Sequence, residues 1–186
     1  MNEELPTLIA EAQAIATDAR KTFGHLNGTQ LNWKPGADRW SVAQCFSHLI
    51  AINSDYFPII ERIARGDYKP SWQERLPLLP RLFGSLVLSG VKPGAPRKLK
   101  ANPRFDPSSS AIEPDIVAKF DAHQRAVVDH MRMTERIDLR RLIITSPVAS
   151  VATYSLLDAY RIIVAHERRH MEQARRVTEL PGFPRR

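Results

Sequence analysis

The strongest constraint on the fold of this chain is a helical repeat of apolar residues near its C-terminal end. From about residue 153 to residue 178, apolar side chains recur every three or four positions, the period of an amphipathic α-helix. Projected at about 100° per residue, one face carries Leu156, Ala159, Ile162, Ile163, His166, His170, Gln173, Ala174 and Val177. The opposite face carries Arg161, Arg168, Glu172 and Arg175. A long helix with one apolar face has to bury that face against other elements, so this segment predicts a packed helical layer.

Three further segments carry the same period, at about residues 6–23, 41–55 and 110–133. Ser41 and Gln44 match a capping box at the start of the second segment, and Pro58 is expected to kink or end that helix. No stretch alternates in the way that predicts a β-strand. Residues 142–153 contain β-branched side chains, but Pro147 and small residues favour an extended linker there.

Residues 66–111, between the second and third helices, are the least regular part of the sequence. Prolines forbid a long helix there, at Pro70, Pro77, Pro80, Pro93, Pro96, Pro103 and Pro107. Residues 81–89 could form a short helix. The sequence therefore predicts a single domain over residues 1–186, an all-α, up-and-down four-helix bundle. A long irregular connection is expected between its second and third helices.

The composition narrows the class of partner. A net charge of +7 and a pI near 9.9 suit an anionic ligand. No zinc-finger spacing or RNA-recognition motif accompanies the positive charges, so nucleic acid is not expected. No apolar run is long enough for a membrane span, and the acidic start lacks the features of a secretory signal. Cys45 is the only cysteine, so nothing indicates an oxidising compartment, and we expect a cytoplasmic protein.

Two histidines interrupt the buried face of the last helix. His166 and His170 are one helical turn apart, so both imidazoles could reach one ion at about 2.0–2.1 Å each. The second helix adds His48 on an expected inner stripe of Gln44, Cys45, His48, Ile52, Asp55, Tyr56 and Ile59. Three imidazoles from two helices would leave a coordination position open, which is typical of catalytic metal sites. A core histidine with an ordinary hydrogen bond is the alternative for His48.

Two stretches resemble the DinB-like (DinB/YfiT-like) superfamily of metal-binding four-helix bundles. LNWKPGADRWSVAQCFSHLIAINSDYF is similar to the family's tryptophan–proline loop, capped second helix and histidine. SPVASVATYSLLDAYRIIVAHERRHMEQARRV is similar to its last helix with His-x-x-x-His. The resemblance implies zinc or nickel bound by His48, His166 and His170, and a homodimer. Characterised relatives include thiol S-transferases that use bacillithiol or mycothiol, and a mycothiol-dependent maleylpyruvate isomerase.

Residues 166–170 also match H-E-x-x-H, the zinc-peptidase motif whose glutamate is the general base. Arg176 stands where a metzincin would have its third histidine, which argues against that class. Glu167 could instead hold a metal-bound water or a histidine N–H, or form a surface ion pair with a neighbouring arginine. Asp55 could accept a proton from an imidazole or a substrate, or pair with an arginine.

The leading hypothesis is a divalent-metal-dependent enzyme that transfers a low-molecular-weight thiol to an electrophilic small molecule. The acidic groups of the thiol, bacillithiol or mycothiol for example, would contact Arg97, Lys98, Lys100 and Arg104. An alternative is a metal-dependent amide or ester hydrolase, with Glu167 or Asp55 as the catalytic proton acceptor. A second alternative is a non-enzymatic, stress-related metal-binding protein.

Overall fold

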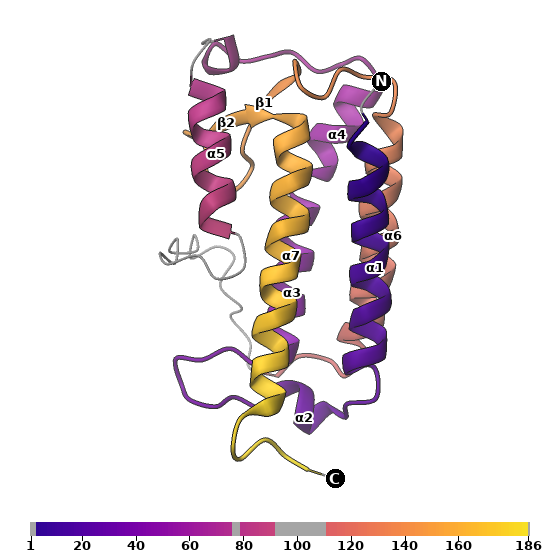
Figure 1. The fold of residues 1–186 in the computed structure, drawn as a ribbon, viewed down its shortest axis with the longest axis vertical. Helices are drawn as coiled ribbons and strands as arrows, with labels where there is room; N and C mark the ends of the chain where they lie inside the picture. Colours follow the sequence, from indigo (N-terminus) through magenta and orange to yellow (C-terminus); the bar gives the residue numbers. More distant parts are fainter. Residues whose placement is uncertain (1–2, 76–78, 92–110, 186) are drawn as a thin grey trace.

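Four long helices form a bundle in the computed structural model, which describes residues 3–75, 79–91 and 111–185 (Figure 1). The helices α1 and α3 lie diagonally opposite each other, and each contacts both α6 and α7. The predicted all-α four-helix bundle with a long connection before its third long helix is confirmed. The bounds of the four helices are α1, Leu5–Phe23; α3, Val42–Ser54; α6, Ile116–Met133; and α7, Leu156–Glu179.

The directions of the four long helices add detail to the expected up-and-down bundle. In Figure 1, α1 and α7 run downward, whereas α3 and α6 both run upward. The connection after α3 therefore returns the chain to the lower end of the bundle before α6 begins. There the side chain of Asn32, in the short helix α2 (Gly28–Asn32), accepts from the backbone N–H of Ile112 and donates to its carbonyl. These two bonds fix the point from which α6 starts.

The second predicted helix, at about residues 41–55, is confirmed as α3 with its capping box of Ser41 and Gln44. It ends at Ser54, and a separate helix, α4 (Phe57–Ala64), follows. Pro58 lies in the first turn of α4, where its missing N–H costs no hydrogen bond. The far end of the predicted inner stripe is less buried than expected, at Ile52, Asp55 and Ile59, although the two isoleucines pack against the core. Those three side chains are only partly buried, whereas Asn53, Tyr56 and Ile60 are buried.

Two predictions about secondary structure are wrong. Residues 142–153 are not a linker, because β1 (Ile143–Thr145) pairs with the antiparallel strand β2 (Thr153–Ser155). The third long helix begins at Ile116 and not near residue 110. By contrast, the helix predicted over 81–89 exists as α5 (Leu79–Val91), which packs against α7 and β2.

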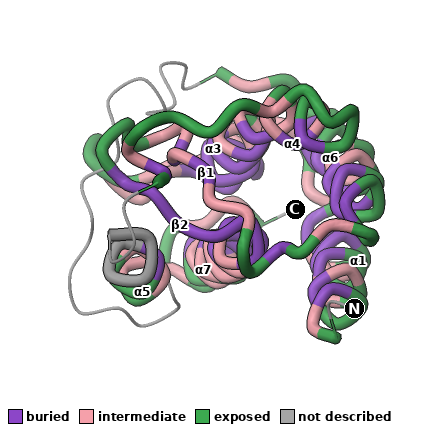
Figure 2. The backbone as a smooth tube through the Cα atoms, turned by 90° about the horizontal axis from the view of Figure 1, so that it is seen from above, coloured by how far each residue is buried: buried purple, intermediate pink, exposed green. Residues whose placement is uncertain are grey.

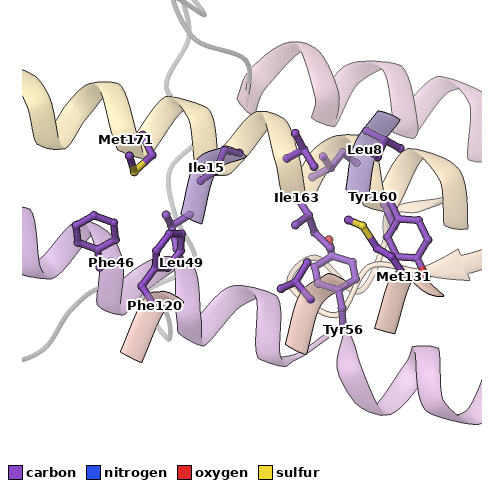
Figure 3. Close-up of a cluster of buried hydrophobic side chains, with 14 of the residues drawn as sticks. Leu8, Ile15, Phe46, Leu49, Tyr56, Phe120, Met131, Tyr160, Ile163 and Met171 are labelled. Carbon is purple, nitrogen blue, oxygen red and sulfur yellow. The ribbon is translucent and has the colours of Figure 1, made fainter. Parts of the chain in front are cut away.

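The core lies between the four long helices, whose buried residues line the inside of the bundle (Figure 2). Figure 3 shows large apolar side chains from all four meeting there. The helix α7 is buried on more than one face because it contacts α1, α3 and α5. None of the helices in the described part of the chain has both the length and the apolar composition that crossing a membrane requires.

Candidate metal centre

Three imidazoles from two helices meet beside the core. His48 comes from the middle of α3, and His166 and His170 come from successive turns of α7. One ring nitrogen of each lies within 4.8 Å of the other two. The Nε2 atoms of His166 and His170 are 3.0 Å apart, and the ring of His48 lies 4.8 Å from that of His170. The three predicted metal ligands are therefore brought together.

The donor set fits a divalent metal ion. Two nitrogens that lie about 2.1 Å from a common ion, at right angles to each other, are about 3 Å apart. The Nε2 atoms of His166 and His170 already have this separation. Imidazole nitrogen is a good ligand for zinc and nickel. Among the described residues the cluster contains no carboxylate and no cysteine, so three neutral ligands would face the ion.

The surroundings keep His166 and His170 neutral, which is the form that binds metal. Burial, with smaller contributions from His48 and the guanidinium of Arg169, lowers the pKa of His166 to about 3. Burial also lowers the pKa of His170, with smaller contributions from the neighbouring imidazoles and Arg169. An incoming cation would therefore not have to displace a proton from either ring at neutral pH.

Trp40 covers the imidazole cluster on one side. Its ring stacks on His170 at 5.4 Å between centroids and meets the edge of His48 at 4.7 Å. The residue directly precedes the capping serine of α3, so the start of that helix fixes the position of the indole. Sequence reasoning placed Trp40 in a loop and did not assign it to the site. Its position before the cap was the available signal.

Glu167 points into the core beneath the cluster. Its carboxylate is fully buried and accepts hydrogen bonds from Asn53 Nδ2 at 2.7 Å and Gln124 Nε2 at 2.9 Å. Burial raises the pKa of Glu167 to about 7, although both amides oppose this shift. The alternative of a surface ion pair is therefore wrong. The sequence did not lead us to assign Asn53 and Gln124 to the site. Each is a polar residue on an inward-facing helical stripe, and that position was the available signal.

Comparisons with known proteins identify the family and the fold of the chain. The family model of the DinB superfamily matches residues 12–174. The chain belongs to the DinB superfamily. One solved structure with the same fold is YfiT from Bacillus subtilis, described as a probable metal-dependent hydrolase with an unusual four-helix bundle topology. It is 12% identical, with a TM-score of 0.57 over 96% of this chain and 88% of YfiT. No curated protein matches the chain.

Other described side chains of this DinB-superfamily chain that carry possible ligand atoms lie outside the cluster. Asp55 is the C-terminal cap of α3, is partly buried and does not belong to the candidate ligand set. His123 and His130 stack on Phe57 and not on the three histidines. Cys45 is buried, which raises the pKa of its thiol to about 12 and keeps it protonated. The basic residues proposed to bind a thiol lie outside the described residues: Arg97, Lys98, Lys100 and Arg104.

Proposed function

We propose that this protein is a divalent-metal-dependent enzyme that transfers a low-molecular-weight thiol to an electrophilic small molecule. The observation that carries the proposal is the cluster of three imidazoles from two helices, two buried and one half-buried, with no carboxylate among the described candidate ligands. His48, His166 and His170 would hold the ion, with zinc or nickel as the expected metal. Three protein ligands would leave a position for a substrate or co-substrate.

The charge of this donor set favours an anionic fourth ligand. Three neutral imidazoles do not compensate the two positive charges of the ion. A bound divalent cation would lower the pKa of a thiol or a water at the open position and so make a nucleophile available near neutral pH. A free thiol, with a pKa of about 8.5, needs much less help to ionise than water does. A candidate ligand set that holds no carboxylate among the described residues therefore suits a thiol better than water.

The surrounding residues would hold the histidines in position and limit the access of water to the site. The indole of Trp40 covers His48 and His170 and would limit the access of bulk water. Glu167 bonds α7 to α3 through Asn53 and to α6 through Gln124. Because its carboxylate is enclosed by these amides, we assign it to positioning the histidines. Its predicted role as a catalytic proton acceptor, like that of Asp55, stays a prediction.

Hydrolysis of an amide or ester is the second candidate function. It is favoured by the description of YfiT as a metal-dependent hydrolase and by the common fold. This reading needs a group that accepts a proton from the attacking water. Glu167 is the carboxylate closest in sequence to two of the histidines, but its full burial separates it from solvent. We therefore rank hydrolysis below thiol transfer.

The test is a paired assay of protein loaded with one equivalent of zinc or nickel. Thiol consumption is followed with bacillithiol, mycothiol and a simple thiol, each with an alkylating electrophile, and ester hydrolysis is followed without thiol. We expect thiol-dependent turnover that is lost in His170→Ala and retained in His25→Ala, which changes an exposed histidine. Hydrolysis without thiol would favour the second candidate. Metal binding without turnover in either assay would contradict both and favour a non-enzymatic protein.

A further inference from the structure

Arg169 lies beside the imidazole cluster and belongs to the same helix. It follows His166 by three positions, so the two side chains leave neighbouring positions on the surface of α7. The residue is half-buried. Its positive charge contributes to the lowered pKa of His166 and of His170, after burial and the neighbouring imidazoles. The charge of Arg169 is therefore felt where a metal ligand would bind.

Arg169 differs from the other arginines of α7 in its partners. The other four each pair with a carboxylate: Arg161 with Glu4 and Asp158, Arg168 with Glu11, Arg175 with Asp18, and Arg176 with Glu172. No carboxylate of the described residues lies within ion-pair distance of Arg169. Its Nη1 donates instead to the backbone carbonyl of Gly90, near the C-terminal end of α5. Arg169 is thus the arginine of α7 that has no ion pair within the described part of the chain.

Within residues 3–75, 79–91 and 111–185, the bond to Gly90 is the one hydrogen bond of the Arg169 guanidinium, and it uses only one of its donors. A guanidinium has five N–H groups in a fixed plane, and the carbonyl of Gly90 uses one of them. The remaining donors can bind a carboxylate through two parallel hydrogen bonds. The bond to Gly90 also holds the guanidinium in one orientation, which reduces the entropy lost when an anion binds.

We propose that Arg169 binds a carboxylate of the small molecule that occupies the open position of the metal centre. This inference rests on the proposed function, because it requires a ligand held by the three histidines. It identifies the thiol or its acceptor as an anion with a carboxylate a few bonds from the group that reaches the metal. One unpaired guanidinium matches a monoanionic carboxylate, whereas a phosphate dianion usually needs additional cations.

The experiment compares a charged thiol with its neutral counterpart. Co²⁺-loaded protein is titrated with mercaptoacetate and with mercaptoacetamide, and thiolate binding is followed by the visible absorbance of the cobalt. We expect mercaptoacetate to bind about tenfold more tightly, the size of one charge-assisted interaction. In Arg169→Gln the preference should disappear while the affinity for mercaptoacetamide changes little. Arg169→Lys, which keeps the charge without the planar donor set, should retain part of the preference.

Arg168→Gln is the matched control. It removes the same charge from the adjacent position, where the side chain is exposed and paired with Glu11. The control should keep the full preference for mercaptoacetate. Equal binding of both thiols by the wild-type protein, or an unchanged preference in Arg169→Gln, would contradict the role of Arg169 but not the proposed metal-dependent function. If no cobalt binds, or neither thiol perturbs its spectrum, the proposed function fails as well.

Discussion

At the scale of single residues, Glu167 and the neighbouring histidines have different roles in the site. The histidines present their nitrogens to one another, whereas Glu167 turns inward and bonds to Asn53 and Gln124. A buried carboxylate that serves only to connect helices can be replaced by an isosteric amide. A carboxylate that accepts a proton during turnover cannot. The two roles are therefore separable by one conservative substitution.

We predict that Glu167→Gln preserves the fold and becomes relatively more stable as pH rises. Burial raises the folded-state pKa of Glu167 from 4.5 to about 7, so its stabilising contribution is fully present below the unfolded value. That contribution is lost as pH rises through 7 in the wild-type protein, but glutamine does not titrate. The free energy of unfolding of Glu167→Gln, relative to that of the wild-type protein, should rise by about 2 kcal/mol between pH 5 and pH 8.

Urea denaturation of both metal-free proteins at the two pH values measures this difference. Glu172→Gln, on the same helix but outside the core, is the control and should show no such trend. A difference between wild type and Glu167→Gln that does not change with pH would mean that Glu167 is already ionised without cost. Loss of turnover in Glu167→Gln at unchanged metal affinity would instead support the catalytic role.

The site residues differ in how far the sequence could predict them. The convergence of His166 and His170 followed from their spacing on an apolar helical face. The approach of His48 depended on packing between α3 and α7, for which the inward stripe and the family resemblance were the signals. The partners of Glu167 come from two other helices, and no local pattern in the sequence specifies such contacts. Trp40 was not assigned to the site because its loop has no periodicity that defines a facing direction.

At the scale of elements, the small pieces at the upper end of the bundle depend on one buried carboxylate. Glu74, in the single-turn helix η1 (Gln73–Arg75), accepts from the hydroxyl of Tyr68 and the backbone N–H of Ser71. It also accepts from the backbone N–H and the hydroxyl of Thr145 in β1. This carboxylate connects the start of the long connection to the strand pair.

We predict that Glu74→Gln destabilises the protein by about 2 kcal/mol, because an amide cannot accept all four bonds and partly buried donors lose their acceptor. Hydrogen exchange should become faster at the amide of Thr145, while amides in α7 should exchange faster only by the amount that the loss of global stability explains. Glu135→Gln, at an exposed position, is the control and should leave both unchanged. Unaltered exchange at Thr145 would show that β1 is held by its pairing with β2 alone.

The elements that the sequence did not predict share a physical cause. The strands β1 and β2 have three residues each, too few to show an alternating pattern. Pro58 was expected to kink or end the second helix, but a proline in the first turn of a helix is equally compatible with the new start that α4 makes. The late start of α6 depends on the bonds between Asn32 and Ile112, which are distant in the sequence.

At the scale of the whole molecule, the buried imidazoles make the metal-free protein sensitive to acid. Burial lowers the pKa of His123 to about 4 and of His166 to about 3, and it lowers that of His170 as well. Between these values and the ordinary 6.5, the unfolded chain binds protons that the folded state does not. Glu167 acts in the opposite direction, so these four groups together take up about two protons on unfolding.

We predict that the stability of the metal-free protein falls as pH drops below about 6.5. Each net proton contributes about 1.4 kcal/mol per pH unit, and partial exposure reduces the share of His123. Melting temperatures measured between pH 7 and pH 5 should therefore decrease steadily, and His123→Asn should reduce the slope. A melting temperature that stays constant over this interval would mean that the histidines are solvated.

The most direct test of the metal centre is the metal content of the purified protein and of single-histidine variants. The wild-type protein, dialysed after exposure to zinc or nickel, should contain about one ion per chain. His48→Ala, His166→Ala and His170→Ala should each lose it, whereas His130→Ala, whose ring stacks on Phe57, should keep it. Retention of a full equivalent of metal by all three cluster variants would contradict the account.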